Sequence, residues 1–366
     1  MKYSDSLSID DLRNNKINIG WKNMTNAKSY YYSLLSKQEQ KVYYAMKTGL
    51  ETMAVSFTVP RLEGKNLADI YFLLRLDHPE LFYSVKFTYR YYQNSENVEI
   101  IPEYLFVKNK LEEQKKAMEA RIKKLLRQAE GLDELGKELF IHDFICQNVR
   151  YDKLKKAYSH EIIGPLGQGI GVCEGIAKTV KVLCDALGIW CIIAISDANP
   201  EKNIKYRHAW NVVRIGNQMY HLDVTFDNTI TNSIALRYDY VNLNDTQFFR
   251  DHEPVIWQVP ECKNGDHAYY REKKLSFTKY EEVRKRTAQA VKKGKVLLFH
   301  WRGGYLTKNV MVDLLQIFEE EAAKKEKFAF VSVNWSQAVL QVSFAQERQE
   351  QAVKLETVDE SVVDPL

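Results

Sequence analysis

A cysteine lies between a glycine-rich segment and an apolar, helix-like segment of this sequence. Residues 167–177 read GQGIGVCEGIA, and the apolar stretch that continues over 178–187 ends at Gly188. The pattern predicts that Cys173 stands at the N-terminus of a buried helix. Unpaired N–H groups and a partial positive charge at such a terminus stabilise a thiolate and can bind a developing oxyanion. Cys173 is therefore a candidate nucleophile, although this segment alone is equally compatible with a cysteine that only packs.

Downstream of the cysteine, two strand-like segments are joined by a very short turn. A buried strand is expected over 189–195, followed by a polar loop and then by strands over 206–215 and 218–227. The two residues between the last two strands, Gly216 and Asn217, are typical of a tight connection. The sequence therefore predicts an antiparallel hairpin here.

The register of this hairpin brings a histidine and an aspartate together. With the two-residue turn in place, His208 lies opposite Thr225 and Asp223 lies opposite Trp210. The His208 and Asp223 side chains then project from the same face of the sheet as diagonal neighbours. That separation suits a carboxylate that orients an imidazole.

Three motifs together resemble the core of the transglutaminase-like superfamily, a papain-type Cys-His-Asp fold, in its bacterial branch: GVCEGIA at 171–177, HAWNVV at 208–213 and YHLDVTFD at 220–227. The segment NVRYD at 148–152 is similar to the one that precedes the nucleophile in these proteins. The resemblance covers about 135–272. It implies an α+β fold in which the nucleophile, at a helix N-terminus, packs on an antiparallel sheet.

By this resemblance, Cys173 is the nucleophile, His208 the general base and acid, and Asp223 the residue that fixes the imidazole tautomer. The implied reaction is attack on an amide of a peptide or protein, which leaves a thioester on the enzyme. Water then gives a hydrolase, a cysteine peptidase or amidase, whereas an amine gives an acyltransferase. The alternative is a non-catalytic interaction or scaffold protein that retains the fold, but the complete triad favours an enzyme.

The same resemblance implies that the backbone N–H of Cys173 and one side-chain donor bind the oxyanion. Gln168, five residues before Cys173, is the candidate donor. The papain-like pattern places its glutamine about one residue further upstream, so His160 and Tyr158 stay as alternatives.

Several residues near the triad can be interpreted either as substrate-binding or as structural. Glu174 is a candidate for binding a cationic substrate, but it equally complements the helix N-terminus. Trp210 is a candidate substrate contact, although a tryptophan on this strand is more often a wall of the site. His221 is expected to face away from the site, and Cys184 and Cys191 are expected in the core.

We expect no metal and no other cofactor. Cys173, His208 and Asp223 supply no local pair of ligands at the spacing that zinc sites use. His142 and Asp143 are adjacent on a predicted helix, where neighbouring side chains point about 100° apart. They therefore form a poor ligand pair.

We expect four parts along the chain: an α+β N-terminal region over 1–108, the catalytic domain with its leading helices over 109–280, a small βαββ unit over 285–346, and a flexible acidic tail over 347–366. Within these parts, helices are expected over 26–50, 109–128, 132–149 and 308–323. Strands are expected over 53–60, 82–91, 98–107, 295–300, 328–333 and 338–344.

Composition and charge narrow the class of partner. Lysine and arginine number 52 against 48 aspartates and glutamates, a net charge of +4, so nucleic-acid binding is not indicated. No apolar run is long enough to span a membrane, and residues 1–10 show no secretory signal. Five cysteines without a C-x-x-C pair are typical of free thiols in a reducing compartment. We therefore expect a cytoplasmic protein acting on a peptide or protein; none of these patterns sets its oligomeric state.

Overall fold

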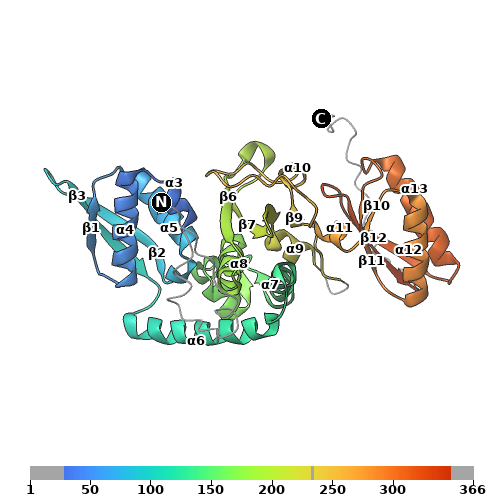
Figure 1. Cartoon of the computed structure of the whole chain (residues 1–366), viewed down its shortest axis with the longest axis horizontal. Helices are drawn as coiled ribbons and strands as arrows, with labels where there is room; N and C mark the ends of the chain where they lie inside the picture. The colour runs from blue at the N-terminus through green and yellow to red at the C-terminus, as the bar shows by residue number, and fades with distance from the viewer. Residues whose placement is uncertain (1–28, 232–234, 348–366) are drawn as a thin grey trace, which may run out of the picture. The chain divides into compact units, whose positions relative to one another are not determined.

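The computed structural model describes residues 29–231 and 235–347, which belong to two compact units, Met1–Glu272 and Lys273–Leu366 (Figure 1). Most of the predicted acidic tail, 348–366, lies outside the described residues, as does the start of the helix predicted over 26–50. No helix within the described ranges is both long and apolar enough to cross a membrane. The four predicted parts remain a prediction about organisation within these two units.

The centre of the first unit is a four-stranded antiparallel sheet covered by a helix. Its strands, in the order β6-β7-β8-β9, are Cys191–Ser196, His208–Ile215, Gln218–Leu222 and Val241–Leu243. The helix α8, Cys173–Leu187, packs its apolar side against β6 and β7. This arrangement confirms the predicted α+β class, with the helix that begins at Cys173 packed on an antiparallel sheet.

Two glycines shape α8. Gly188 ends the helix with a φ of 79°, a left-handed conformation that glycine adopts without strain. Gly175 lies in the first turn, where a Cβ atom would come 2.1 Å from the carbonyl oxygen of Ser159. A larger residue at 175 would therefore push the preceding loop away from the N-terminus of α8.

The hairpin β7–β8 has the predicted register, since Ile215 pairs with Gln218 and Asn211 pairs with Leu222. The predicted second strand is wrong beyond Leu222, however, because the helix α9, Val224–Ile230, begins there. The cause is Asp223, whose carboxylate accepts hydrogen bonds from the first N–H groups of α9 and so starts a helix. Asp223 thus stands at the junction of a strand and a helix.

Between residue 29 and α8, the structure has a three-stranded antiparallel sheet and five α-helices. Its elements are α3 Tyr30–Leu34, α4 Lys37–Glu51, β1 Phe57–Pro60, α5 Gly64–Asp77, β2 Ser84–Tyr91, β3 Asn97–Tyr104, α6 Lys108–Leu126 and α7 Glu134–Asn148. The strand order is β1-β3-β2. The single helix predicted over 26–50 is wrong. Ser36 forms a capping box with Glu39 and starts a new helix, α4.

Short elements connect the larger ones in the first unit. Strands β4, Arg150–Tyr151, and β5, Ile170–Gly171, pair in parallel just before α8. The remaining pieces are the helical turns η1 Pro79–Leu81, η2 Arg127–Ala129, η3 Ala157–His160, η4 Gly164–Gln168 and η5 Pro200–Lys202, and the helices α10 Asp245–Phe248 and α11 Tyr269–Glu272.

The second unit is a four-stranded sheet with two helices. Its elements are β10 Ser276–Phe277, α12 Tyr280–Lys293, β11 Leu297–Trp301, α13 Lys308–Ala323, β12 Phe328–Asn334 and β13 Val339–Ala345, with strand order β10-β11-β13-β12. The predicted βαββ unit corresponds to the last four of these elements. The sequence did not predict α12, because half of its residues are charged and few are buried.

Candidate active site

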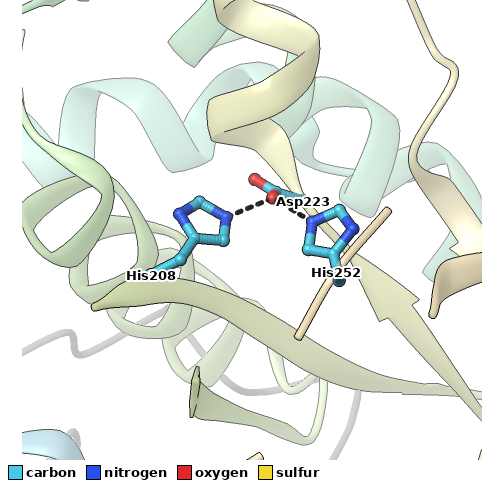
Figure 2. A group of neighbouring side chains, drawn as sticks. All are labelled: His208, Asp223 and His252. Carbon is cyan, nitrogen blue, oxygen red and sulfur yellow. Dashed lines mark hydrogen bonds and ion pairs between the residues drawn. The ribbon is translucent and has the colours of Figure 1, made fainter. Parts of the chain in front are cut away.

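The structure brings the three predicted triad residues together. Cys173 is the first residue of α8, His208 is the first residue of β7, and Asp223 precedes α9. The Nε2 atom of His208 lies 2.6 Å from Oδ2 of Asp223 (Figure 2). The Sγ atom of Cys173 lies 4.0 Å from the carbonyl oxygen of Arg207, the residue before His208. Because the Asp223 carboxylate binds Nε2 of His208, Nδ1 is the ring nitrogen that can exchange a proton with the Cys173 sulfur.

The charges around His208 favour its protonated form. Burial alone would lower the pKa of His208, but the charge and hydrogen bond of Asp223 outweigh it. With the further contribution of the Cys173 sulfur, the pKa of His208 rises to about 10. Phe226 packs against the ring, with centroids 4.8 Å apart. His208 is therefore a fixed imidazolium at neutral pH.

Asp223 is fully buried and accepts four hydrogen bonds. Its Oδ1 accepts from the N–H groups of Thr225 at 2.8 Å and Phe226 at 3.0 Å. Its Oδ2 lies 2.6 Å from His208 and 2.9 Å from Nε2 of His252, a second histidine (Figure 2). Burial would raise the pKa of Asp223, but the two imidazoles lower it below its ordinary value. The carboxylate thus stays ionised.

Sequence reasoning missed His252. It lies in the irregular segment after α10, between Asp251 and Glu253, where no periodic pattern assigns a face to any side chain. The only feature of the local sequence that could have indicated His252 is the run of three polar residues, 251–253.

Sequence reasoning also gave no role to Tyr151, which lies beside the nucleophile. Burial raises the pKa of its hydroxyl to about 12, and the charges of Cys173 and Asp223 add to the effect. The backbone N–H of Cys173 acts in the opposite direction. The Tyr151 hydroxyl is thus close enough to Cys173, at the N-terminus of α8, for both the charge and the N–H of that residue to affect its pKa.

The predicted oxyanion donor Gln168 lies in a different environment. It ends the turn η4 and lines a cavity of about 860 Å³, whereas Cys173 lies elsewhere, on α8. The other lining residues come mainly from α6 and α7. Of the two alternatives, His160 is bound through Nδ1 to Glu174 at 3.1 Å, and Tyr158 packs at the edge of the main core.

Glu174 belongs to a buried network of charges behind the nucleophile. Its carboxylate lies 2.7 Å from Nζ of Lys178, 3.1 Å from His160 and 3.9 Å from Arg75. Arg75 and Lys178 also form ion pairs with Glu161, and Nζ of Lys178 lies 2.8 Å from the Glu161 carboxylate. Burial would raise the pKa of Glu174, but Lys178, followed by His160 and Arg75, lowers it below its ordinary value. The charge of Glu174 is thus compensated within the protein.

Trp210 lies behind His208. It is 1% exposed, and its ring lies 5.9 Å from the His208 ring. Its Nε1–H donates to Nδ1 of His221 at 3.0 Å, and His221 in turn contacts Asp245 through Nε2 at 2.8 Å. Because Nδ1 accepts, the proton of the neutral His221 ring is on Nε2. The buried Trp210 ring thus has the position expected of a wall of the site rather than of a substrate contact.

Within the part of the chain that the structure describes, two groups of side chains bring potential metal ligands within 4.8 Å of one another: His208, Asp223 and His252, and His221, Asp245 and Cys262. In the second group, a metal on Nε2 of His221 would move the ring proton to Nδ1, where it would face the N–H of Trp210. That group is therefore a poor metal site. In the first group, both histidines already donate to Asp223.

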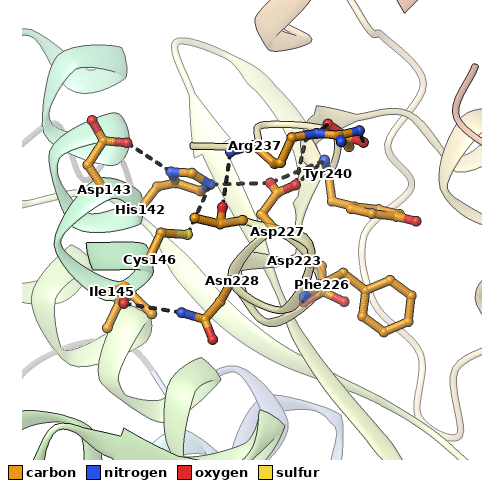
Figure 3. A network of polar contacts seen from close by, with 12 residues as sticks. His142, Asp143, Ile145, Cys146, Asp223, Phe226, Asp227, Asn228, Arg237 and Tyr240 are labelled. Carbon is orange, nitrogen blue, oxygen red and sulfur yellow. Dashed lines mark hydrogen bonds and ion pairs between the residues drawn. The ribbon is translucent and has the colours of Figure 1, made fainter. Parts of the chain in front are cut away.

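A second polar network fixes the helix that Asp223 caps (Figure 3). Asp227 of α9 accepts the N–H of Asp239 at 2.7 Å and contacts Nε2 of His142 at 3.2 Å. Nδ1 of His142 lies 3.0 Å from Asp143, and Arg237 makes a two-point ion pair with Asp239. His142 and Asp143, considered above as metal ligands, thus join α7 to the base of the site.

All five cysteines are free. The structure confirms that Cys184 and Cys191 are buried, and Cys262 is buried as well. Cys146 and Cys173 are partly exposed, and the sulfur of Cys146 lies 3.7 Å from Nε2 of His142. Both partly exposed thiols must therefore be followed in any labelling experiment.

Comparison with known proteins gives a family match over the site. Residues 123–224 match the family model of the transglutaminase-like superfamily, a range that contains all three triad residues. Two solved structures are similar. One is a TGase (TM-score 0.29, 10% identity, 57% of this chain and 61% of that chain), and the other is a proposed cysteine protease from Cytophaga hutchinsonii (TM-score 0.25, 16% identity, 38% and 62%). The chain thus spans about three fifths of either structure. No curated protein matches the sequence.

Proposed function

Since residues 123–224 form a domain of the transglutaminase-like superfamily, we propose that this chain is a thiol enzyme that acts on an amide of a peptide or protein. The observation that supports this most is the 2.6 Å contact between His208 and the buried carboxylate of Asp223, near enough to Cys173 for the sulfur to raise the pKa of His208. An imidazolium beside a sulfur at a helix N-terminus stabilises the thiolate, which is the nucleophilic form.

The geometry supports a two-step reaction. The Cys173 thiolate attacks the amide carbon, and His208 gives its Nδ1 proton to the nitrogen as the C–N bond breaks. The amine leaves and a thioester remains on Cys173. Neutral His208 then takes a proton from water, or from an acceptor amine, which attacks the thioester and releases the thiolate. Asp223 keeps the proton on Nε2 throughout and stays ionised.

We propose that Tyr151, with the backbone N–H of Cys173, binds the oxyanion in the role first predicted for Gln168. Tyr151→Phe removes only the hydroxyl, so kcat should fall about 100-fold. Gln168→Ala is the matched control and should leave kcat within about twofold of the wild type. Steady-state kinetics and thermal unfolding of both variants test this. A Tyr151→Phe enzyme with the kcat of the wild type would contradict the assignment.

The proposed activity is tested by mixing the chain with an unfolded protein and a fluorescent primary amine. Mass spectrometry then separates the outcomes: released ammonia or a new amino terminus reports thioester formation in either case, a free carboxylate at the attacked amide indicates hydrolysis, and a fluorescent adduct indicates acyl transfer. The Cys173→Ala protein serves as the blank. If the wild type and the blank give the same products, the chain is instead the non-catalytic interaction protein that the sequence left as an alternative.

A further inference from the structure

His252 carries a pair of contacts that only a charged ring can make. Its Nε2 lies 2.9 Å from Oδ2 of Asp223 (Figure 2). Its Nδ1 lies 2.9 Å from Oδ1 of Asp251. An ionised carboxylate accepts hydrogen bonds but donates none. Both ring nitrogens of His252 must therefore donate, which requires a proton on each. His252 is thus an imidazolium between two carboxylates.

Aromatic rings hold His252 in this position. Phe248 stacks on it, with centroids 3.8 Å apart and an angle of 27° between the planes, and Phe226 lies at 4.4 Å. The side chain is 1% exposed. Asp251 is fixed in turn, because it accepts a hydrogen bond from the Tyr240 hydroxyl at 2.7 Å. The ring has no room to turn away from Asp223.

The charges of Asp223, His252 and Asp251 sum to one negative charge. Asp223 and Asp251 each contribute one negative charge, and His252 contributes one positive charge. The His208 ring, with its centroid 5.5 Å from that of His252, therefore faces a net single negative charge, as it would beside one isolated aspartate. Without the cation, His208 would face two carboxylates and hold its proton more tightly.

We propose that His252 is a positioning residue of this site, whose imidazolium holds Asp223 against His208 and limits how tightly His208 keeps the proton that the leaving amine needs. The inference rests on the function proposed above, and it adds Asp251 as a second carboxylate that fixes the His252 ring from its other nitrogen. A base that holds its proton too tightly is a poor general acid.

The titratable groups that face His252 from each surrounding element are consistent with this role: Asp223 before α9, Asp251 beside it, His208 of β7, His221 of β8, and Tyr240 before β9. Burial would lower the pKa of His252, but its hydrogen bonds with Asp223 and Asp251 raise it above the ordinary value, while the charge of His208 opposes the rise. The direction of this shift agrees with the charged ring that the two donated hydrogen bonds require.

The first test is ¹⁵N NMR of the wild-type chain with labelled histidine, using His252→Asn to assign the His252 signals. We expect both ring nitrogens of His252 to be protonated at pH 7. A neutral ring with a single proton would overturn the inference, whatever the variants do.

The second test follows the deprotonation midpoint of His208 in the same spectra, together with the alkaline limb of kcat/KM. Asp251→Asn removes a negative charge, so the midpoint should fall by about one pH unit from its value near 10. His252→Asn removes a positive charge, so the midpoint should rise by a similar amount. The double variant should return close to the wild type. A purely structural role for His252 predicts lower activity without opposite shifts, and that result would overturn the proposal.

These two readouts separate the inference from the function on which it rests. NMR needs no substrate, so opposite shifts in a chain that turns over no amide would refute the proposed function and keep the charge assignment. Normal turnover with an unmoved His208 midpoint would refute the role of His252 alone.

Discussion

Replacement of Cys173 by alanine should lower amide turnover by about 10⁴-fold or more, because no other thiol lies beside the His208–Asp223 pair. Among the described residues, the other partly exposed cysteine is Cys146, which contacts His142 instead. Alanine removes one sulfur from a partly exposed position, so the unfolding temperature should change by only a few degrees.

The matched control for this prediction is Cys146→Ser. This variant should keep the turnover of the wild type within about threefold, since Cys146 touches the network below α9 and not the nucleophile. Turnover is measured as released amine under saturating substrate, and the fold by circular dichroism. Activity that survives Cys173→Ala and disappears in Cys146→Ser would place the reaction at the other thiol.

Lys178→Met should lower the free energy of unfolding by about 3–5 kcal/mol, the largest stability effect that we predict. Lys178 is fully buried and lies between Glu161 and Glu174. Methionine preserves the volume but leaves both carboxylates with less compensating charge. The remaining cation, Arg75, lies 3.9 Å from Glu174 and cannot replace it.

Urea unfolding measures this effect, with two controls. Lys47→Met breaks an exposed pair with Glu51 and should cost under about 0.5 kcal/mol. The double variant Lys178→Met/Glu174→Gln should recover part of the loss, because it removes one uncompensated charge. A cost under about 1 kcal/mol for Lys178→Met alone would show that the network contributes little to stability.

Local patterns in the sequence were sufficient to predict the central helix and the central hairpin of the fold. The glycines around Cys173 and the apolar segment behind it predicted α8, and the two-residue turn predicted the register of β7 and β8. Both depend on contacts between residues close in sequence. The alternation of residues after Leu222 also suits a strand, but the Asp223 carboxylate satisfies the N–H groups of Thr225 and Phe226 and starts α9 instead.

The groups around the triad depend on tertiary contacts that no local pattern carries. His252 reaches Asp223 from an irregular segment 29 residues away, and Tyr151 reaches Cys173 from a two-residue strand. Arg75 comes from α5, in the region to which the sequence assigned no role in the site. A buried ion pair produces no periodic pattern in the sequence, because each partner is an ordinary polar residue in its own helix, strand or loop.

The pH dependence of Cys173 alkylation tests the central claim most directly. Iodoacetamide reacts with thiolates, so its rate at Cys173 is followed by mass spectrometry from pH 5 to 9 in a Cys146→Ser background, with and without His208→Ala. We predict fast labelling of Cys173 at pH 6, where His208 is protonated, and a rate about 100-fold lower without His208, since an ordinary cysteine is under about 1% thiolate at that pH. Equal and slow labelling of both proteins at pH 6 would contradict an imidazolium-stabilised thiolate, and with it the proposal that this chain is a thiol enzyme.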